Sequence, residues 1–114
     1  MPFLRIQTNA TIEATRLEPL LKKASQLAAR ELGKPEQYMM VGCETVRAML
    51  FAGSSQPAAF LELKSIGLPA GKTAVLSDQL CELVGSELGV PRDRIYLNFA
   101  DVPASHWGWN GETF

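Results

Sequence analysis

The sequence lacks the features that mark several broad classes of protein. Its formal net charge is -1 at pH 7, so there is no basic excess of the kind that binds nucleic acid. No apolar run approaches the roughly 20 residues needed to cross a bilayer. The N-terminus shows no basic region followed by an apolar core, as a secretory signal would. We therefore expect a cytoplasmic protein that binds neither nucleic acid nor membrane.

Cysteine and histidine are also scarce. Cys43 and Cys81 form no CxxC pair and no zinc-binding spacing, and His106 is the only histidine. We expect two free, buried thiols rather than a disulfide, because such cysteines are typical of a reducing compartment. We expect no metal ion, no cofactor and no catalytic role for His106.

What is present indicates one globular domain, residues 1–114, with 46% hydrophobic and 20% charged residues. Alternating side chains predict strands over Phe3–Gln7 and Ala58–Ile66. The apolar run Tyr38–Val46 predicts a strand that is covered on both faces or lies at an interface. Arg47–Phe51 either extends that strand or forms a short edge strand. Two further strands are expected, at Arg94–Phe99 and within the tail His106–Asn110.

Apolar residues at three- and four-residue spacings predict two helices. The first ends at Gly33 and the second at Gly89, because glycine commonly closes a helix. Proline is tolerated only in the first turn of a helix. We therefore expect the first helix to begin within a residue or two of Pro19.

The two halves of the sequence match. Glu31–Pro35 resembles Glu87–Pro91 at an offset of 89 − 33 = 56. The same offset relates two pairs of predicted strands: Phe3–Gln7 with Ala59–Leu63, and Tyr38–Val41 with Arg94–Leu97. The pattern predicts a tandem β-α-β duplication in which each unit has parallel strands. The expected fold is α+β, with a four-stranded mixed sheet and two helices on one face.

The second face of such a sheet has no helix to cover it. We expect it to carry apolar residues of strands such as Met39–Val46, which would form a large exposed patch. A symmetric oligomer that packs the bare faces together would remove this patch from water.

Six segments carry a resemblance that runs over essentially the whole chain: Met1-Pro2, Gly33–Tyr38, Gly53–Pro57, Ser65–Gly67, Asp93–Asn98 and Gly108–Phe114. With them the chain resembles the macrophage migration inhibitory factor family of the tautomerase superfamily. The resemblance implies a homotrimer of β-α-β-β-α-β subunits around a central channel, with active sites between neighbouring subunits. It implies an isomerase, a keto–enol tautomerase of phenylpyruvate-like α-keto acids and dopachrome-type compounds. It also leaves non-classical secretion open.

The resemblance makes Pro2 the catalytic base. Many proteins begin Met-Pro for no chemical reason, but removal of Met1 would leave Pro2 with a free secondary amine. Tautomerisation needs a base whose pKa lies near the working pH. Burial and a nearby cation both lower the pKa of an amine, so the mechanism predicts an apolar surround and a positive charge near Pro2.

The resemblance also implies the substrate-binding residues. Lys34 would bind the substrate carboxylate and disfavour protonated Pro2; the alternative is that it only complements a helix dipole. Ser65 and Ile66 end a predicted strand and are both expected to bind substrate, Ile66 through its backbone. Asn98 matches a contact donated by a neighbouring subunit, and Tyr96 lies two residues earlier on the same strand face. Aromatic candidates for the walls of the pocket are Phe3, Tyr38, Trp107, Trp109 and Phe114.

Three departures from the family pattern qualify these expectations. The segment Ala58–Leu61 has no cysteine where some members carry CxxC, so thiol–disulfide activity is not expected. Trp107 stands where a smaller apolar residue is usual, which predicts a narrower or reshaped pocket. Lys64 adds a second cation that would lower the pKa of Pro2 further.

Two other functions stay open. The chain would be a cytokine-like signalling or interaction protein if it kept the fold and lost turnover. It would be a hydratase or dehalogenase if it followed other members of the superfamily, although these are often half this length. The presence of the Pro2, Lys34, Ile66 and Asn98 set favours the tautomerase.

Overall fold

The main chain follows the order of elements that the repeat predicts. A computed structural model describes residues 1–114. The main elements are β1 (Pro2–Thr8), α1 (Ala14–Leu32), β2 (Met40–Thr45), β3 (Ala59–Ile66), α2 (Thr73–Leu88) and β4 (Ile95–Val102). A small hairpin of β5 (Gly108–Trp109) and β6 (Glu112–Thr113) follows. Single 3-10 turns lie at Glu36–Tyr38, Ala70–Lys72, Arg92–Arg94 and Ala104–His106.

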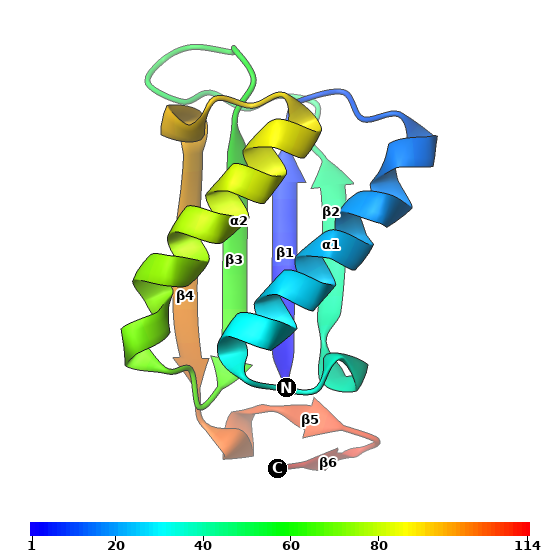
Figure 1. The fold of residues 1–114 in the computed structure, drawn as a ribbon, viewed down its shortest axis with the longest axis vertical. Helices are drawn as coiled ribbons and strands as arrows, with labels where there is room; N and C mark the ends of the chain where they lie inside the picture. The colour runs from blue at the N-terminus through cyan, green and yellow to red at the C-terminus, as the bar shows by residue number, and fades with distance from the viewer.

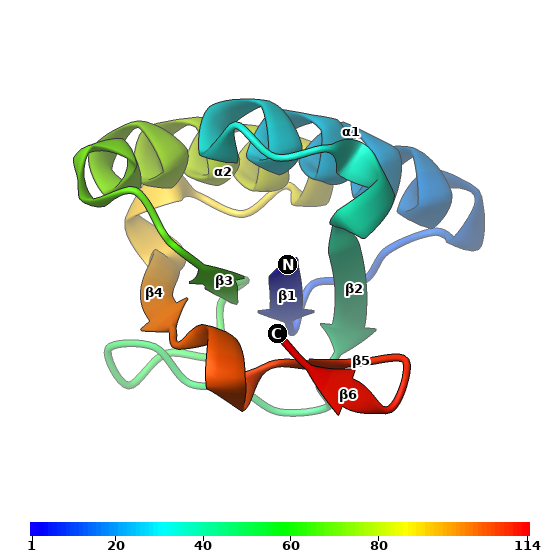
Figure 2. The same cartoon turned by 90° about the horizontal axis from the view of Figure 1, so that it is seen from below.

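The strands form one mixed sheet in the order β2-β1-β3-β4. β1 is parallel to β2 and antiparallel to β3, and β3 is parallel to β4. Both helices cover the same face of this sheet (Figure 1, Figure 2). A core cluster of 16 buried residues, drawn from both halves of the chain, fills the space between the two layers. The predicted α+β fold is confirmed.

The duplication is visible in the backbone where each helix ends. Gly33 and Gly89 both adopt the left-handed conformation, with φ of 68° and 70°, and stand 89 − 33 = 56 residues apart. The next N–H in each half bonds back to the helix at 3.0 Å, from Lys34 to the Ala29 carbonyl and from Val90 to the Gly85 carbonyl. The local sequence therefore ends both helices with the same backbone conformation. After the first helix the chain continues into β2, and after the second it continues into β4.

The start of α1 differs from the prediction. The helix begins at Ala14 and runs for 19 residues, with Pro19 inside it. Pro19 has no N–H, so the carbonyl of Thr15 loses its helical partner. Both residues are exposed, and water can therefore solvate that carbonyl. Neither helix combines the length and the apolar character that a membrane span requires.

Three predicted strands have different bounds in the structure. β2 begins at Met40 rather than Tyr38, because the Tyr38 N–H bonds the Pro35 carbonyl at 3.1 Å and closes a 3-10 turn. Residues 47–51 form no strand and contribute only a bridge between Phe51 and Ser54. β4 continues to Val102, three residues beyond the predicted end.

The bare face of the sheet is more polar than the sequence suggested. The run at β2 divides between the two faces: Val41 and Cys43 pair with core residues of β1, whereas Gly42 pairs with Arg5 and Glu44 with Gln7. On the bare face Arg5 forms an ion pair with Glu44 at 2.7 Å and a longer one with Glu62 at 3.7 Å. A dry interface between bare faces would bury these charges. The bare face is therefore mixed rather than uniformly apolar, since Arg5 and Glu44 share it with Met40 and Tyr96. Packing of bare faces in an oligomer stays a prediction.

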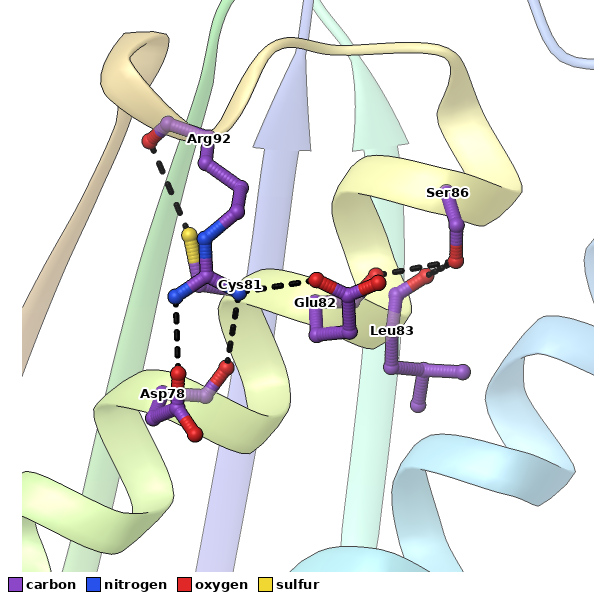
Figure 3. A network of polar contacts seen from close by, with 6 residues as sticks. All are labelled: Asp78, Cys81, Glu82, Leu83, Ser86 and Arg92. Atoms are coloured by element: carbon purple, nitrogen blue, oxygen red, sulfur yellow. Dashed lines mark hydrogen bonds and ion pairs between the residues drawn. The ribbon is translucent and has the colours of Figure 1, made fainter.

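The turn after α2 folds back on the helix through Arg92 (Figure 3). Its guanidinium donates to the carboxylates of Asp78 at 2.8 Å and Glu82 at 2.9 Å, and its carbonyl accepts the Cys81 thiol at 3.6 Å. Cys81 is buried, Cys43 is half-buried, and both are free thiols, as predicted. Burial raises the pKa of both thiols, which keeps them protonated at neutral pH.

Gly85 should tolerate no side chain, although it lies inside a helix. Replacing a helix glycine with alanine usually stabilises a helix by about 1 kcal/mol. At Gly85, however, a Cβ would lie 2.9 Å from the Val90 carbonyl oxygen and 3.4 Å from Ile95 Cδ1. We expect Gly85→Ala to lower the free energy of unfolding by about 1 to 3 kcal/mol, because the clash is with backbone.

Urea unfolding at a fixed protein concentration measures this effect. Ser86→Ala, at the exposed neighbouring helix position, is the matched control and should stay within about 0.5 kcal/mol of the parent. A Gly85→Ala protein that is more stable than the parent would contradict this prediction. It would show that the backbone at Val90 can move away from the added Cβ at little cost.

Candidate functional site

A cleft lies at the end of the sheet where β1 begins and β3 ends. Its volume is about 430 Å³, and its lining residues are Met1, Lys34, Pro35, Tyr38, Ile66, Trp109 and Phe114. The N-terminus and the β5–β6 hairpin lie together at this end of the molecule (Figure 1). Of the predicted residues, the structure thus brings Lys34, Tyr38, Ile66, Trp109 and Phe114 together beside the N-terminus.

The amine at the N-terminus lies in an environment that favours its neutral form. Pro2 is buried at the start of β1, in register with Ser65 of β3, and Met1 reaches from it into the cleft. Burial, and then the Lys34 ammonium, hold the pKa of the Met1 amine below its usual value. An amine with a lowered pKa is a free base over more of the neutral pH range, which is what general-base catalysis requires.

Lys34 reaches the cleft because of the way α1 ends. Gly33 takes the left-handed conformation, and the Lys34 N–H closes the last turn on the Ala29 carbonyl. Pro35 then starts the 3-10 turn that carries Tyr38, a residue that is 44% exposed. Pro35 lines the cleft without having been predicted; its only signal was its position between two predicted residues.

The C-terminal hairpin supplies the aromatic wall. Trp109 and Phe114 stack with their ring centroids 6.4 Å apart and their planes 21° apart. The Phe114 N–H donates to the Trp107 carbonyl at 3.2 Å. Trp107 therefore holds Phe114 through its backbone, and its indole does not line the cleft. Trp109, rather than Trp107, forms the aromatic wall of the cleft together with Phe114.

Ser65 and Ile66 have different positions although they are adjacent. Ile66 lines the cleft, whereas Ser65 is fully buried on the helix side and its hydroxyl donates to the Ile66 carbonyl at 3.1 Å. Phe3 and Lys64 pair with each other on the bare face, outside the cleft lining. Lys34, and not Lys64, is the cation that lowers the pKa of the Met1 amine. An effect of Lys64 on the Pro2 amine stays a prediction.

Tyr96 and Asn98 lie away from the cleft of their own chain. Both are exposed on the bare face of β4, in register with Phe60 and Glu62. Tyr96 packs instead against Phe51, with ring centroids 4.7 Å apart. If these residues touch a substrate, the cleft must belong to another copy of the chain.

The other predicted features need only brief comment. His106 is exposed in the turn Ala104–His106. No group of three or more His, Cys, Asp or Glu side chains is arranged to hold a metal ion.

The repeat places residues equivalent to Pro2 and Lys34 at the opposite end of the sheet, but these residues provide neither a free amine nor a cation. With the offset of 56, Pro2 corresponds to Ala58 and Lys34 to Val90. The Ala58 N–H is an amide that donates to the Asn9 side chain at 2.8 Å, and Val90 is buried. Only one end of the sheet therefore combines a free amine with a cation.

Comparisons with known proteins agree over the full length of the chain. The model of the macrophage migration inhibitory factor (MIF) family matches residues 1–114. The macrophage migration inhibitory factor homolog of Brugia malayi is 39% identical over 115 residues, covering 100% of this chain and 99% of that protein. The factor of Meriones unguiculatus matches to the same extent, at 39%.

Solved structures give the same result. The homologue from Prochlorococcus marinus superposes with a TM-score of 0.93 at 41% identity, covering 98% of both chains. The factor of Toxoplasma gondii superposes with a TM-score of 0.93 at 34% identity, covering 98% of this chain and 99% of that one. The chain belongs to the macrophage migration inhibitory factor family.

Proposed function

We propose that the protein is a keto–enol tautomerase of phenylpyruvate-like α-keto acids and dopachrome-type compounds. We further propose that it acts as a single domain of residues 1–114 within a homotrimer and uses no cofactor. One observation carries the proposal: the terminal amine, with its pKa lowered by burial and by Lys34, opens into an apolar, aromatic cleft. A cation beside aromatic walls suits a small aromatic carboxylate.

The proposed base is the Pro2 nitrogen after removal of Met1. In the keto-to-enol direction, neutral Pro2 takes a proton from the carbon beside the carbonyl. The electron pair of that C–H bond forms the new C=C bond, and the carbonyl π pair moves to oxygen. The protonated amine then returns the proton to that oxygen, so the base is regenerated. The reverse sequence converts enol to ketone.

The lining residues have separate roles in this proposal. The Lys34 ammonium binds the substrate carboxylate, and a charge-assisted hydrogen bond of this kind is stronger than a neutral one. Tyr38, Trp109 and Phe114 pack against the substrate ring, for which offset or tilted aromatic contacts are favourable. The backbone of Ile66 borders the cleft where the developing enolate would lie.

The homotrimer would complete the cleft and cover exposed apolar surface. Met40, Leu50 and Tyr96 are 65%, 71% and 64% exposed in the single chain, which is costly in water for side chains of this size. We propose that Tyr96 and Asn98 of a neighbouring copy reach the cleft, because they lie outside the cleft of their own chain.

Intact-mass analysis combined with an activity assay tests the proposal. Protein shown to lack Met1 should convert the enol of phenylpyruvate to the ketone, as measured by the loss of enol absorbance. Light scattering at micromolar concentration should give the mass of a trimer. A trimer without Met1 that turns over neither phenylpyruvate nor a dopachrome ester would contradict the enzyme and favour the signalling alternative. A monomer would contradict the shared cleft.

A further inference from the structure

The turn that follows β3 borders the cleft and is held from a neighbouring strand. Ile66 is the last residue of β3, and the chain reverses at Gly67, which has a φ of 62°. The N–H of Leu68 then donates to the carboxylate Oδ1 of Asp101 at 3.1 Å. On the other side, the Ser65 hydroxyl donates to the Ile66 carbonyl. One side-chain hydrogen bond therefore reaches the Ile66 carbonyl, and a second holds the turn two residues later at Leu68.

Asp101 stands in one row of the sheet with the proposed base. Pro2 of β1 pairs with Ser65 of β3, and Ser65 pairs with Asp101 of β4. The Asp101 carboxylate forms no ion pair, and its hydrogen bond is made with the backbone N–H of Leu68. A hydrogen bond to an ionised acceptor is stronger than a neutral one. The carboxylate therefore accepts a hydrogen bond from the backbone of the turn and is not engaged by an arginine or lysine side chain.

We infer that Asp101 is a positioning residue for the proposed tautomerase, which holds the Gly67–Leu68 turn and so sets the place of Ile66 relative to Pro2. The inference rests on the proposed function. Asp101 does not touch the cleft itself. Its effect on the reaction would come from geometry, since misplacement of a substrate-positioning group by about 1 Å can cost up to about 100-fold in rate.

A direct effect of the Asp101 charge is the competing explanation. A nearby carboxylate would stabilise a protonated amine and raise its pKa, opposite to Lys34. Asp101 does not line the cleft, and the causes of the lowered pKa of the Met1 amine are burial and Lys34. If Asp101 acts only by holding the turn, removing its charge should leave the pH profile of Met1-free protein unchanged.

Two substitutions at Asp101 separate the two explanations. In Met1-free protein, Asp101→Ala should lower kcat/KM for phenylpyruvate about 10-fold, mainly through KM, without moving the pH of half-maximal kcat/KM. Asp101→Asn keeps an acceptor oxygen and should stay within about 3-fold of the parent. Asp93→Ala, in the exposed turn before β4, is the control and should match the parent.

Amide hydrogen exchange gives a readout that is independent of activity. The Leu68 amide should exchange faster in Asp101→Ala than in the parent and should be protected in Asp101→Asn. Equal losses of activity in both variants, a shift of the pH midpoint, or unchanged Leu68 exchange in Asp101→Ala would each overturn the inference. An inactive parent with normal Leu68 protection would instead overturn the proposed function.

Discussion

Replacement of Pro2 by glycine is expected to lower kcat/KM for phenylpyruvate by about 100-fold or more. General-base catalysis typically contributes about 100- to 10,000-fold. Glycine, like proline, permits removal of Met1, so Pro2→Gly keeps an amine but loses the ring that fixes the nitrogen at the start of β1. The residual rate should come from that flexible primary amine.

An alanine inserted before Pro2 makes the same test more severe. In that variant the Pro2 nitrogen is an amide, which has no basicity, and the free amine belongs to another residue. We expect the rate to fall to near the uncatalysed value, as measured by phenylpyruvate ketonisation. Intact mass must confirm the N-terminus of each variant, and light scattering must show that assembly is unchanged. Parent-like rates in both variants would exclude the prolyl base.

Loss of the Lys34 charge should have the second largest effect. A hydrogen bond to a charged group contributes about 1.5 to 3 kcal/mol. Lys34→Ala should therefore lower kcat/KM by about 10- to 100-fold, chiefly by raising KM for the carboxylate substrate. Lys22→Ala, which removes a surface lysine of α1 outside the cleft lining, is the matched control and should be neutral.

The pH profile gives Lys34→Ala a second signature. The base is active when neutral, so kcat/KM should rise with pH through the pKa of the amine and then level off. For the Met1 amine, burial is the larger cause of the lowered pKa and Lys34 the smaller one. We expect the same two causes to act on the Pro2 amine once Met1 is removed. In Lys34→Ala the midpoint should thus move to higher pH, but not back to that of a solvated amine. If Lys34→Ala left both the pH midpoint and KM unchanged, Lys34 would have no role in the site. Its only role would then be to close the C-terminal end of α1.

Most of the fold could be predicted because its signals are local. The apolar stripes of both helices, the closing residues Gly33 and Gly89, and the offset of 56 identify the two halves. The prediction failed where contacts between residues far apart in the sequence determine the backbone conformation. Residues 47–51 follow a loop because Arg94 donates to the carbonyls of Phe51 at 3.2 Å and Pro57 at 2.9 Å. No pattern within the loop announces that contact.

The candidate site was predicted less completely, and the errors have a shared cause. The sequence indicated Lys34, Tyr38, Ile66 and Phe114, which meet in the cleft, and both Trp107 and Trp109 as candidates for its wall. It could not decide between neighbouring side chains. Trp109 rather than Trp107 enters the wall because the hairpin turns at Asn110 and Gly111, both with positive φ, and stacks Trp109 on Phe114.

The amino-acid sequence by itself determined the duplicated β-α-β plan and the Met1-Pro2 terminus, because helix period, strand alternation and chain ends are properties of short segments. Only the tertiary structure decided that the N-terminal amine and Lys34 lie close together at one end of the sheet, and that Val90 is buried at the repeat-related end. It also decided that the bare face carries the Arg5 ion pairs. Strand register and helix packing bring together residues far apart in the chain, and the resulting burial and charge set the chemistry of each end.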